Sequence, residues 1–152
     1  MRRKKEPRWV SKAATLAIHE MLLAEHGGIT GIRDEGLLDS ALASPRNLLA
    51  CEEPDLLQLA AAYAHALSRN HPFHDGNRRV ALTVAGVFPE LNGLRLVAPE
   101  PDAITAVLAL STHEFDQAGF AAWLRDSSTR IKKPASAPPS KRATTKRKAG
   151  TR

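Results

Sequence analysis

The feature that most constrains the fold is a run of nine residues, VALTVAGVF, at positions 80–88. Thr83 is the only strongly polar side chain in it. A helix that is apolar around its whole circumference is stable only where other elements cover it on every side. The run therefore predicts a buried central helix, and the rest of the chain must supply the elements that surround it.

Apolar residues recur at three- and four-residue steps in several other segments, which predicts further helices over about 9–25, 54–69, 101–111 and 117–126. A shorter helix, capped by Asp34, is expected to end at Ser44–Pro45, because the residue before a proline avoids the helical region. Pro54 suits the first position of the next helix. In the first helix the expected inward face comprises Val10, Ala13, Ala14, Ala17, Ile18 and Met21.

Few strand signals accompany these helices. The segment LRLV at 94–97 predicts only a brief extended stretch, and Phe88–Pro89 should kink or end the central helix. Helices that follow one another through short connections, without a convincing strand pair, indicate an all-α domain.

The 152-residue chain has a formal net charge of +6, but this charge is unevenly distributed. Residues 131–152 hold eight Lys or Arg and no acid, and residues 1–8 hold five against one acid, which leaves 9 basic and 15 acidic residues in 9–130. We expect a basic N-terminal segment (1–8), one domain (9–128) and a disordered Lys/Arg-rich tail (129–152). The tail is either merely solvated or contacts RNA or an acidic partner non-specifically through its charge.

Cysteine usage and hydropathy indicate a cytoplasmic protein. Cys51 is the only cysteine, so no internal disulfide is expected, and no C-x-x-C zinc spacing exists. The basic start, MRRKKEPRW, is not followed by the apolar region of a signal peptide. No apolar run approaches the roughly 20 residues of a membrane span, so no membrane partner is expected.

Nine residues that lead into the central helix, HPFHDGNRR at 71–79, form the most distinctive motif. Free backbone N–H groups and the positive dipole end at a helix start attract phosphate, and Gly76 lets a ligand approach the backbone closely. Arg78 and Arg79 add positive charge in the first turn, where it is unfavourable unless an anion binds.

Two further side chains of this motif suit phosphoryl chemistry. Asp75 offers the oxygen ligands that Mg²⁺ prefers, and His71 is the residue type that acts as a general base near neutral pH. Each also has a plain interpretation: Asp75 as the helix N-cap, His71 as a packed surface ring, and the two arginines as partners of acidic residues. Their combination at a loop-to-helix start favours a phosphate-handling site.

The motif resembles the signature of the Fic/Doc family, H-x-F-x-[DE/N]-[GA]-N-x-R. The matching residues are His71, Phe73, Asp75, Gly76, Asn77 and Arg79. The stretches GITGIRDEGLLDSALASPRN and LNGLRLVAPEPDAITAVLALS are similar to the corresponding parts of death-on-curing toxins, so the resemblance covers about residues 9–127. It implies a Fic/Doc-like helical bundle around the buried central helix, with the motif loop before that helix.

The resemblance also implies an enzyme that moves part of a nucleoside triphosphate onto a protein hydroxyl. In this enzyme His71 is the base that deprotonates the hydroxyl, and Asp75 is the ligand of Mg²⁺. ATP is the expected nucleotide. The implied phosphate contacts come from Arg69, Gly76, Asn77, Arg78 and Arg79.

Two departures from the family pattern bear on which group is transferred. Adenylyl-transferring members have G-N-G-R-x-x-R, whereas this chain has Arg78 in place of a glycine and Leu82 in place of the second arginine. Doc-type members share both departures, and in that branch the nucleotide lies in the opposite orientation. The resemblance thus implies a protein kinase that transfers the γ-phosphate, with AMP transfer as the alternative.

The family further implies a toxin of a toxin-antitoxin system that stalls translation, with an elongation factor as the expected substrate. Self-inhibited Fic proteins carry an [ST]-x-x-x-E-[GN] helix, but here Thr30 and Glu35–Gly36 are one residue too far apart. Inhibition in trans by a Phd-like antitoxin is therefore expected.

Other interpretations remain open. A metal-dependent phosphohydrolase would use His65, His71, His74 and Asp75 as ligands. A non-enzymatic module would dock a protein through the acidic domain and nucleic acid through the basic tails. The loop GGITGIRDEG at 27–36 is either a passive connection or, as we prefer, a flap that docks a target segment by strand addition, as in Fic proteins.

Overall fold

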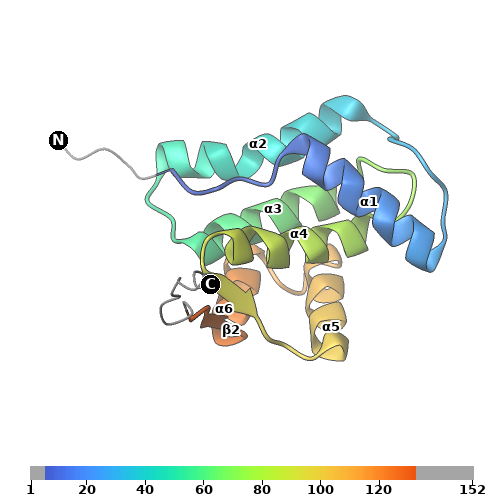
Figure 1. Ribbon diagram of the computed structural model, residues 1–152. Coiled ribbons are helices and arrows are strands. Elements are labelled where there is room, and N and C mark those ends of the chain that lie inside the picture. The colour runs from blue at the N-terminus through green and yellow to red at the C-terminus, as the bar shows by residue number, and fades with distance from the viewer. Residues whose placement is uncertain (1–5, 133–152) are drawn as a thin grey trace, which may run out of the picture.

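The computed structural model describes residues 6–132, so most of the basic N-terminal segment and of the expected tail lies outside the described part. This part forms a helical bundle with one small sheet, which confirms the predicted all-α class (Figure 1). Its elements are α1 (Lys12–His26), α2 (Glu35–Cys51), α3 (Leu56–Asn70), α4 (Asn77–Leu91), β1 (Leu94–Leu96), α5 (Glu100–Ser111), α6 (Gln117–Asp126) and β2 (Ser128–Arg130).

The helices α3 and α4 pack side by side at the centre of the bundle (Figure 1). One side of α3 is covered by α2, and another by α5 and α6. Val80, Val84 and Phe88 of α4 are fully buried, and no side chain from Val80 to Pro89 is exposed. The predicted buried central helix is confirmed, although Leu82 and its neighbours on one face are only half-buried and α3 shares the centre.

The inward face of α1 differs from the predicted one. The buried side chains are Thr15, His19 and Leu22, whereas most residues expected to face inward are exposed, namely Ala13, Ala14, Ala17 and Met21. A polar side chain is tolerated in a core when it is hydrogen-bonded. The hydroxyl of Thr15 donates to the Ser11 carbonyl, and the His19 ring bonds the Asp75 carbonyl, each at 2.9 Å.

Two prolines lie inside helices. The expected end of α2 at Ser44–Pro45 is wrong, whereas Phe88–Pro89, which was expected to kink or end the central helix, lies just before its end at Leu91. The helix α2 continues through Pro45 to Cys51, and α4 continues through Pro89 to Leu91. Each proline lacks the N–H of one backbone hydrogen bond, but both rings are buried, and this burial offsets the loss.

The start of α3 lies at Leu56 rather than at Pro54. The Asp55 carboxylate accepts a hydrogen bond from Gln58 N, and the Gln58 side chain accepts one from Asp55 N, each at 2.8 Å. This reciprocal capping box fixes the first turn, so Pro54 lies before the helix.

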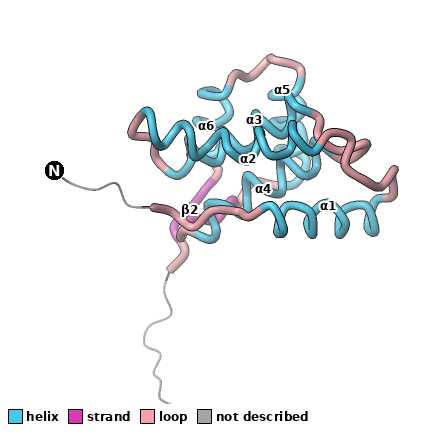
Figure 2. Tube along the Cα trace, turned by 90° about the horizontal axis from the view of Figure 1, so that it is seen from above, coloured by secondary structure: helices cyan, strands magenta, loops and turns pink. Residues whose placement is uncertain are grey.

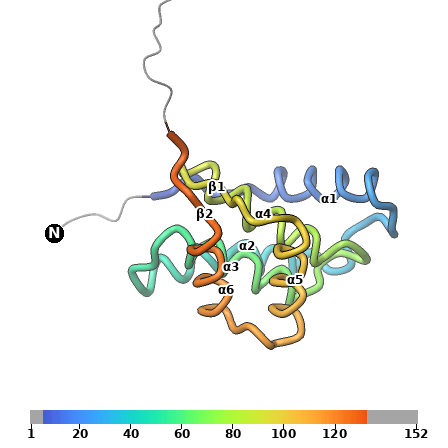
Figure 3. Tube along the Cα trace, turned by 90° about the horizontal axis from the view of Figure 1, so that it is seen from below, coloured from blue at the N-terminus to red at the C-terminus, as the bar shows by residue number. Residues whose placement is uncertain are grey.

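The antiparallel pair of β1 and β2 was not expected (Figure 3). Leu94 pairs with Arg130 and Leu96 with Ser128. The strand β1 lies within LRLV, where a brief extended stretch was predicted. The strand β2 and the pairing carry no local signal, because each strand is only three residues long and the two are distant in the sequence. Residues 129 and 130, which lie past the domain boundary expected after 128, belong to β2.

The segment before α1 packs at the same end of the molecule (Figure 2). Arg8 N donates to the Asn92 side chain at 2.9 Å, and Asn92 Nδ2 donates back to the Arg8 carbonyl at 3.0 Å. Among the described helices, none combines the length and hydropathy that a membrane crossing needs.

Candidate functional site

The loop between α3 and α4 reverses the chain through two residues in the left-handed region. His71, the C-cap of α3, has φ 49° and ψ 56°, and Gly76, the N-cap of α4, has φ 81° and ψ 13°. Residues 71–76 therefore form a tight connection that ends where α4 begins at Asn77, as the motif predicted.

The interior of this loop is held by Phe73, Asn77 and His19. Phe73 is buried, and its N–H and carbonyl both bond the Asn77 side chain, at 3.0 and 2.9 Å. The His19 ring from α1 stacks on the Phe73 ring with centroids 3.9 Å apart and also bonds the Asp75 carbonyl. His19 was missed by the sequence analysis, because its contacts with the motif span more than 50 positions.

The segment before α2 holds the outer side of the loop. Ile32 and Phe73 form an isolated antiparallel bridge, and His74 N donates to the Gly31 carbonyl at 3.2 Å. Arg33 N donates to the Pro72 carbonyl at 2.7 Å. These residues of the proposed docking flap are thus already paired with the motif loop.

The Asp75 carboxylate is exposed and fixed by two backbone groups. Its Oδ1 accepts from Gly76 N at 3.0 Å, and its Oδ2 accepts from Ile29 N at 3.2 Å. The N-cap of α4 is Gly76, and no described side chain caps this helix, so the interpretation of Asp75 as its N-cap is wrong. A carboxylate has about four lone-pair sites, and those that remain suit a hard cation such as Mg²⁺.

The start of α4 differs from the starts of the other described helices. Side chains cap α1, α2, α3 and α6, and α5 has Glu100 and Asp102 in its first turn. The first turn of α4 has neither a capping side chain nor an acidic residue, and it carries Arg78 and Arg79. Both arginines are exposed, and neither forms an ion pair with the residues that the structure describes. This helix end is therefore an electropositive site suited to an anion.

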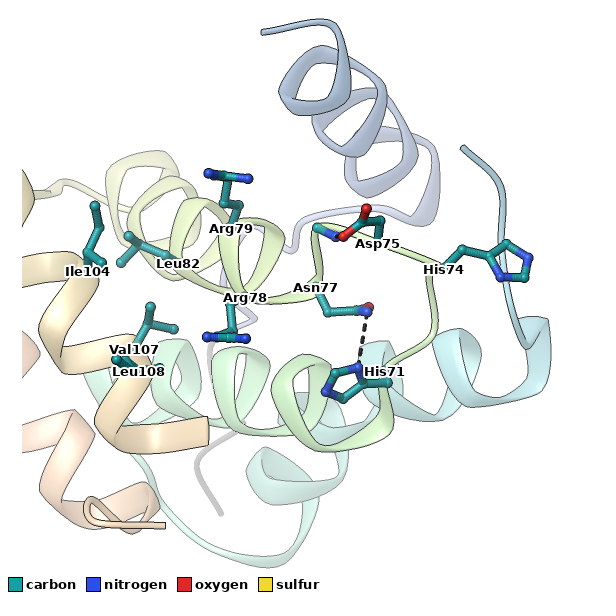
Figure 4. A pocket seen from close by; sticks show the side chains of 11 residues that line it. His71, His74, Asp75, Asn77, Arg78, Arg79, Leu82, Ile104, Val107 and Leu108 are labelled. Carbon is teal, nitrogen blue, oxygen red and sulfur yellow. Dashed lines mark hydrogen bonds between the residues drawn. The ribbon is translucent and has the colours of Figure 1, made fainter. Parts of the chain in front are cut away.

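A pocket of about 400 Å³ opens in front of this helix end, with one polar and one apolar side (Figure 4). Figure 4 shows the arginines between the motif loop and the apolar group, with His74 pointing away from them. The motif contributes His71, His74, Asp75, Gly76, Asn77, Arg78 and Arg79, and the apolar side consists of Leu82, Ile104, Val107 and Leu108. Arg69, in the last turn of α3, is exposed and does not line this pocket.

The ring of His71 contacts Asn77, whose Nδ2 lies 3.3 Å from His71 Nδ1. An amide nitrogen donates and does not accept, so Nδ1 is the acceptor of this contact. The neutral ring then carries its hydrogen on Nε2.

Comparison with known proteins identifies this arrangement. Residues 9–88 match the family model described as the Fic/DOC family, and they include the whole motif. The chain belongs to the Fic/Doc family. It is 30% identical over 119 residues to the "Protein kinase doc" of Escherichia phage P1, an alignment that covers 78% of this chain and 94% of that relative. It is also 42% identical over 74 residues to the "Toxin Doc" of Mycolicibacterium smegmatis, which covers 47% of this chain and 57% of that relative.

Both relatives are Doc proteins, so the chain is a Doc-type member of the Fic/Doc family. The phosphohydrolase interpretation gains no support from the structure. Within residues 6–132, no group of three His, Cys, Asp or Glu side chains is arranged to hold a metal ion.

Proposed function

We propose that this Doc-type protein is a toxin that transfers the γ-phosphate of ATP to a hydroxyl group of a target protein. The observation that carries the proposal is the start of α4, which has no capping side chain. Two arginines without an ion-pair partner in residues 6–132 face a pocket there that also contains His71 and Asp75. The relative from phage P1, which this chain matches over most of its length, is named a protein kinase. The apolar wall at the other side of the pocket suits the nucleoside half of ATP.

The triphosphate is bound by the first turn of α4. Its oxygens accept hydrogen bonds from backbone N–H groups near Gly76 and Asn77 and from the guanidinium groups of Arg78 and Arg79. Asp75 would hold Mg²⁺, and the ion would supply positive charge against the negative charge that develops during the transfer. The side-chain atoms of Asn77 are engaged by Phe73, so this residue contributes its backbone to the anion and its side chain to the loop.

His71 accepts the proton of the attacking hydroxyl. The hydroxyl oxygen forms a bond to the γ-phosphorus, the bond from phosphorus to the β–γ bridging oxygen breaks, and ADP leaves. Proton uptake at Nε2 requires the tautomer with hydrogen on Nδ1, in which the contact with Asn77 is lost while Asn77 keeps both contacts with Phe73. Arg69 lies outside the pocket, so a role for it requires contact with a part of the nucleotide that extends beyond the lining residues.

The choice of γ-phosphate over AMP is supported by Leu82. This side chain stands where adenylyl-transferring members have a second arginine, and it forms part of the apolar wall. An apolar side chain cannot bind phosphate. Among the described residues that line the pocket, Arg78 and Arg79 are therefore the arginines available to the transferred phosphate.

The proposal can be tested by incubating the protein with a bacterial translation extract, Mg²⁺ and ATP labelled at either the γ- or the α-phosphate. A target protein should gain label from γ-labelled ATP alone, and His71→Ala should abolish this. Label from α-labelled ATP would establish AMP transfer instead. A protein that retains its biological effect with His71→Ala would be a binding module.

The biological setting follows from the same proposal. We expect a cytoplasmic toxin whose target belongs to the translation machinery, with an elongation factor as first candidate, and a Phd-like antitoxin that inhibits it in trans. The eight basic residues of 131–152 suit non-specific contact with RNA, which should weaken steeply as salt is raised.

A further inference from the structure

Two backbone carbonyl groups at the end of α3 accept hydrogen bonds from one side chain. This side chain belongs to Arg33, in the segment before α2. Arg33 Nε donates to the His71 carbonyl at 2.7 Å, and Arg33 Nη2 donates to the Asn70 carbonyl at 2.9 Å. The Pro72 carbonyl, next in the chain, accepts from Arg33 N at 2.7 Å and from Asp34 N at 3.0 Å. Three successive carbonyls are thus bound by two adjacent residues.

These contacts support a backbone conformation that is costly for His71. A residue that ends a helix in the left-handed region is usually glycine, because a Cβ atom there approaches the following carbonyl oxygen. His71 has φ 49° and bears a full side chain. A guanidinium on the last carbonyls satisfies acceptors that the helix leaves open and places positive charge at the negative end of its dipole.

Arg33 has no competing acidic partner among the described residues. The carboxylate beside it, that of Asp34, caps α2 by accepting from Leu37 N at 3.0 Å. The same end of α3 is tied to α2 by Asn70 Nδ2, which donates to the Leu37 carbonyl at 2.9 Å. The guanidinium group of Arg33 therefore makes its hydrogen bonds to the backbone at the end of α3, where His71 lies.

We propose that Arg33 is a positioning residue, which locks the backbone of His71 in the left-handed conformation and so aims its ring at the acceptor hydroxyl. Arg33 does not line the pocket, and it acts through His71 rather than on the nucleotide. This role rests on the proposed function of His71 as the base. Under this proposal residues 31–34 help to position the catalytic loop, and this role is separate from any docking of a target.

Substitution of Arg33 should lower the rate of transfer more than the affinity for ATP. In Arg33→Met, kcat should fall about tenfold to a hundredfold, because misplacing a catalytic group by about 1 Å can have such an effect. The KM for ATP should change much less, since Arg78 and Arg79 are untouched. Arg33→Lys keeps the charge but not the pair of N–H donors. Its kcat should lie between that of Arg33→Met and that of the wild type.

The matched control is Arg95→Met, since Arg95 is an exposed arginine whose ion pair is with Glu90 on the opposite part of the fold. It should leave kcat unchanged. Wild-type kcat in a folded Arg33→Met variant would overturn the proposal, as would an equal loss in Arg95→Met. Arg33→Lys provides the same comparison if Arg33→Met does not fold.

A second measurement does not depend on activity. The one-bond Cα–Hα coupling of a residue in NMR spectra is sensitive to the sign of φ. The coupling of His71 should indicate a positive φ in the wild type and a negative φ in Arg33→Met. An unchanged coupling in Arg33→Met would refute the role of Arg33. A wild-type protein that transfers no phosphate would instead refute the proposed function, and the coupling alone would then decide the role of Arg33.

Discussion

At the scale of single residues, Gly28 determines how closely the segment after α1 approaches the motif loop. Its φ is 128°, and a Cβ atom there would lie 2.9 Å from Asp75 Oδ2 and 2.9 Å from Leu23 Cδ2. The neighbouring Gly27 has φ 80°, but a Cβ atom at that position would meet nothing within 4 Å. A substitution at Gly27 would therefore add backbone strain alone. A substitution at Gly28 would add strain and a clash with Asp75, the proposed Mg²⁺ ligand.

We predict that Gly28→Ala displaces the Asp75 carboxylate, whereas Gly27→Ala does not. Both substitutions should destabilise the fold by about 1 kcal/mol or more through the strain of alanine at positive φ. Only Gly28→Ala should raise the Mg²⁺ concentration needed for half-maximal transfer. Unfolding in urea and a Mg²⁺ titration measure the two effects, and equal Mg²⁺ requirements in both variants would contradict the prediction.

The residues of the site that the sequence could identify all lie in one continuous motif. His71, Asp75 and Gly76 are at most five positions apart, and the helix start that brings them together is a local feature. His19 and Arg33 were not identified, because they reach the motif across 56 and 38 positions. Only tertiary packing brings such residues together, and neither belongs to a residue pattern that indicates this role.

At the scale of elements, the two ends of α2 show what the local sequence can and cannot predict. A capping side chain is a local signal, and Asp34 does cap α2 as expected. The end of α2 was predicted wrongly. Whether the helix continues through Pro45 depends on how well the proline ring is buried, and the local sequence does not show this. The helix α4, in contrast, ends at Leu91, close to Phe88–Pro89, where a kink or an end was expected.

The capping box of α3 offers a test of an element far from the chemistry. Asp55→Ala removes the bond to Gln58 N and the ion pair with Arg125, whose atoms are 2.6 Å apart. It should lower the free energy of unfolding by about 1 kcal/mol while kcat stays unchanged, because His71 lies at the other end of α3.

Arg125→Ala is the control for this test, since it removes the exposed ion pair alone and should cost about 0.5 kcal/mol or less. Denaturant unfolding of both variants checks the difference. Equal losses would show that the ion pair, and not the cap, stabilises the start of α3.

At the scale of the whole molecule, His65 links stability to pH. It lies on α3, and partial burial lowers the pKa of its ring from the ordinary value of 6.5, with further lowering by Arg69 and His113. Asp116, the N-cap of α6, acts in the opposite direction. Because the unfolded chain then binds more protons just below pH 6.5, the free energy of unfolding should fall as the pH decreases through this range.

We predict that His65→Gln flattens this decrease in stability. The measurement is urea unfolding between about pH 5.5 and 7.5, a range set by the ordinary pKa of histidine. A wild-type slope in His65→Gln would contradict the prediction.

We have proposed that the motif loop and the start of α4 carry out γ-phosphoryl transfer with His71 as the base. The most direct test of this proposal is intact-mass spectrometry of proteins in a bacterial translation extract after incubation with this protein, ATP and Mg²⁺, with His71→Ala alongside. We predict a target that gains about 80 Da, the mass of one phosphoryl group, and no gain with the variant. A gain of about 329 Da, the mass of a transferred AMP, or a phosphoryl gain that persists in His71→Ala, would contradict it.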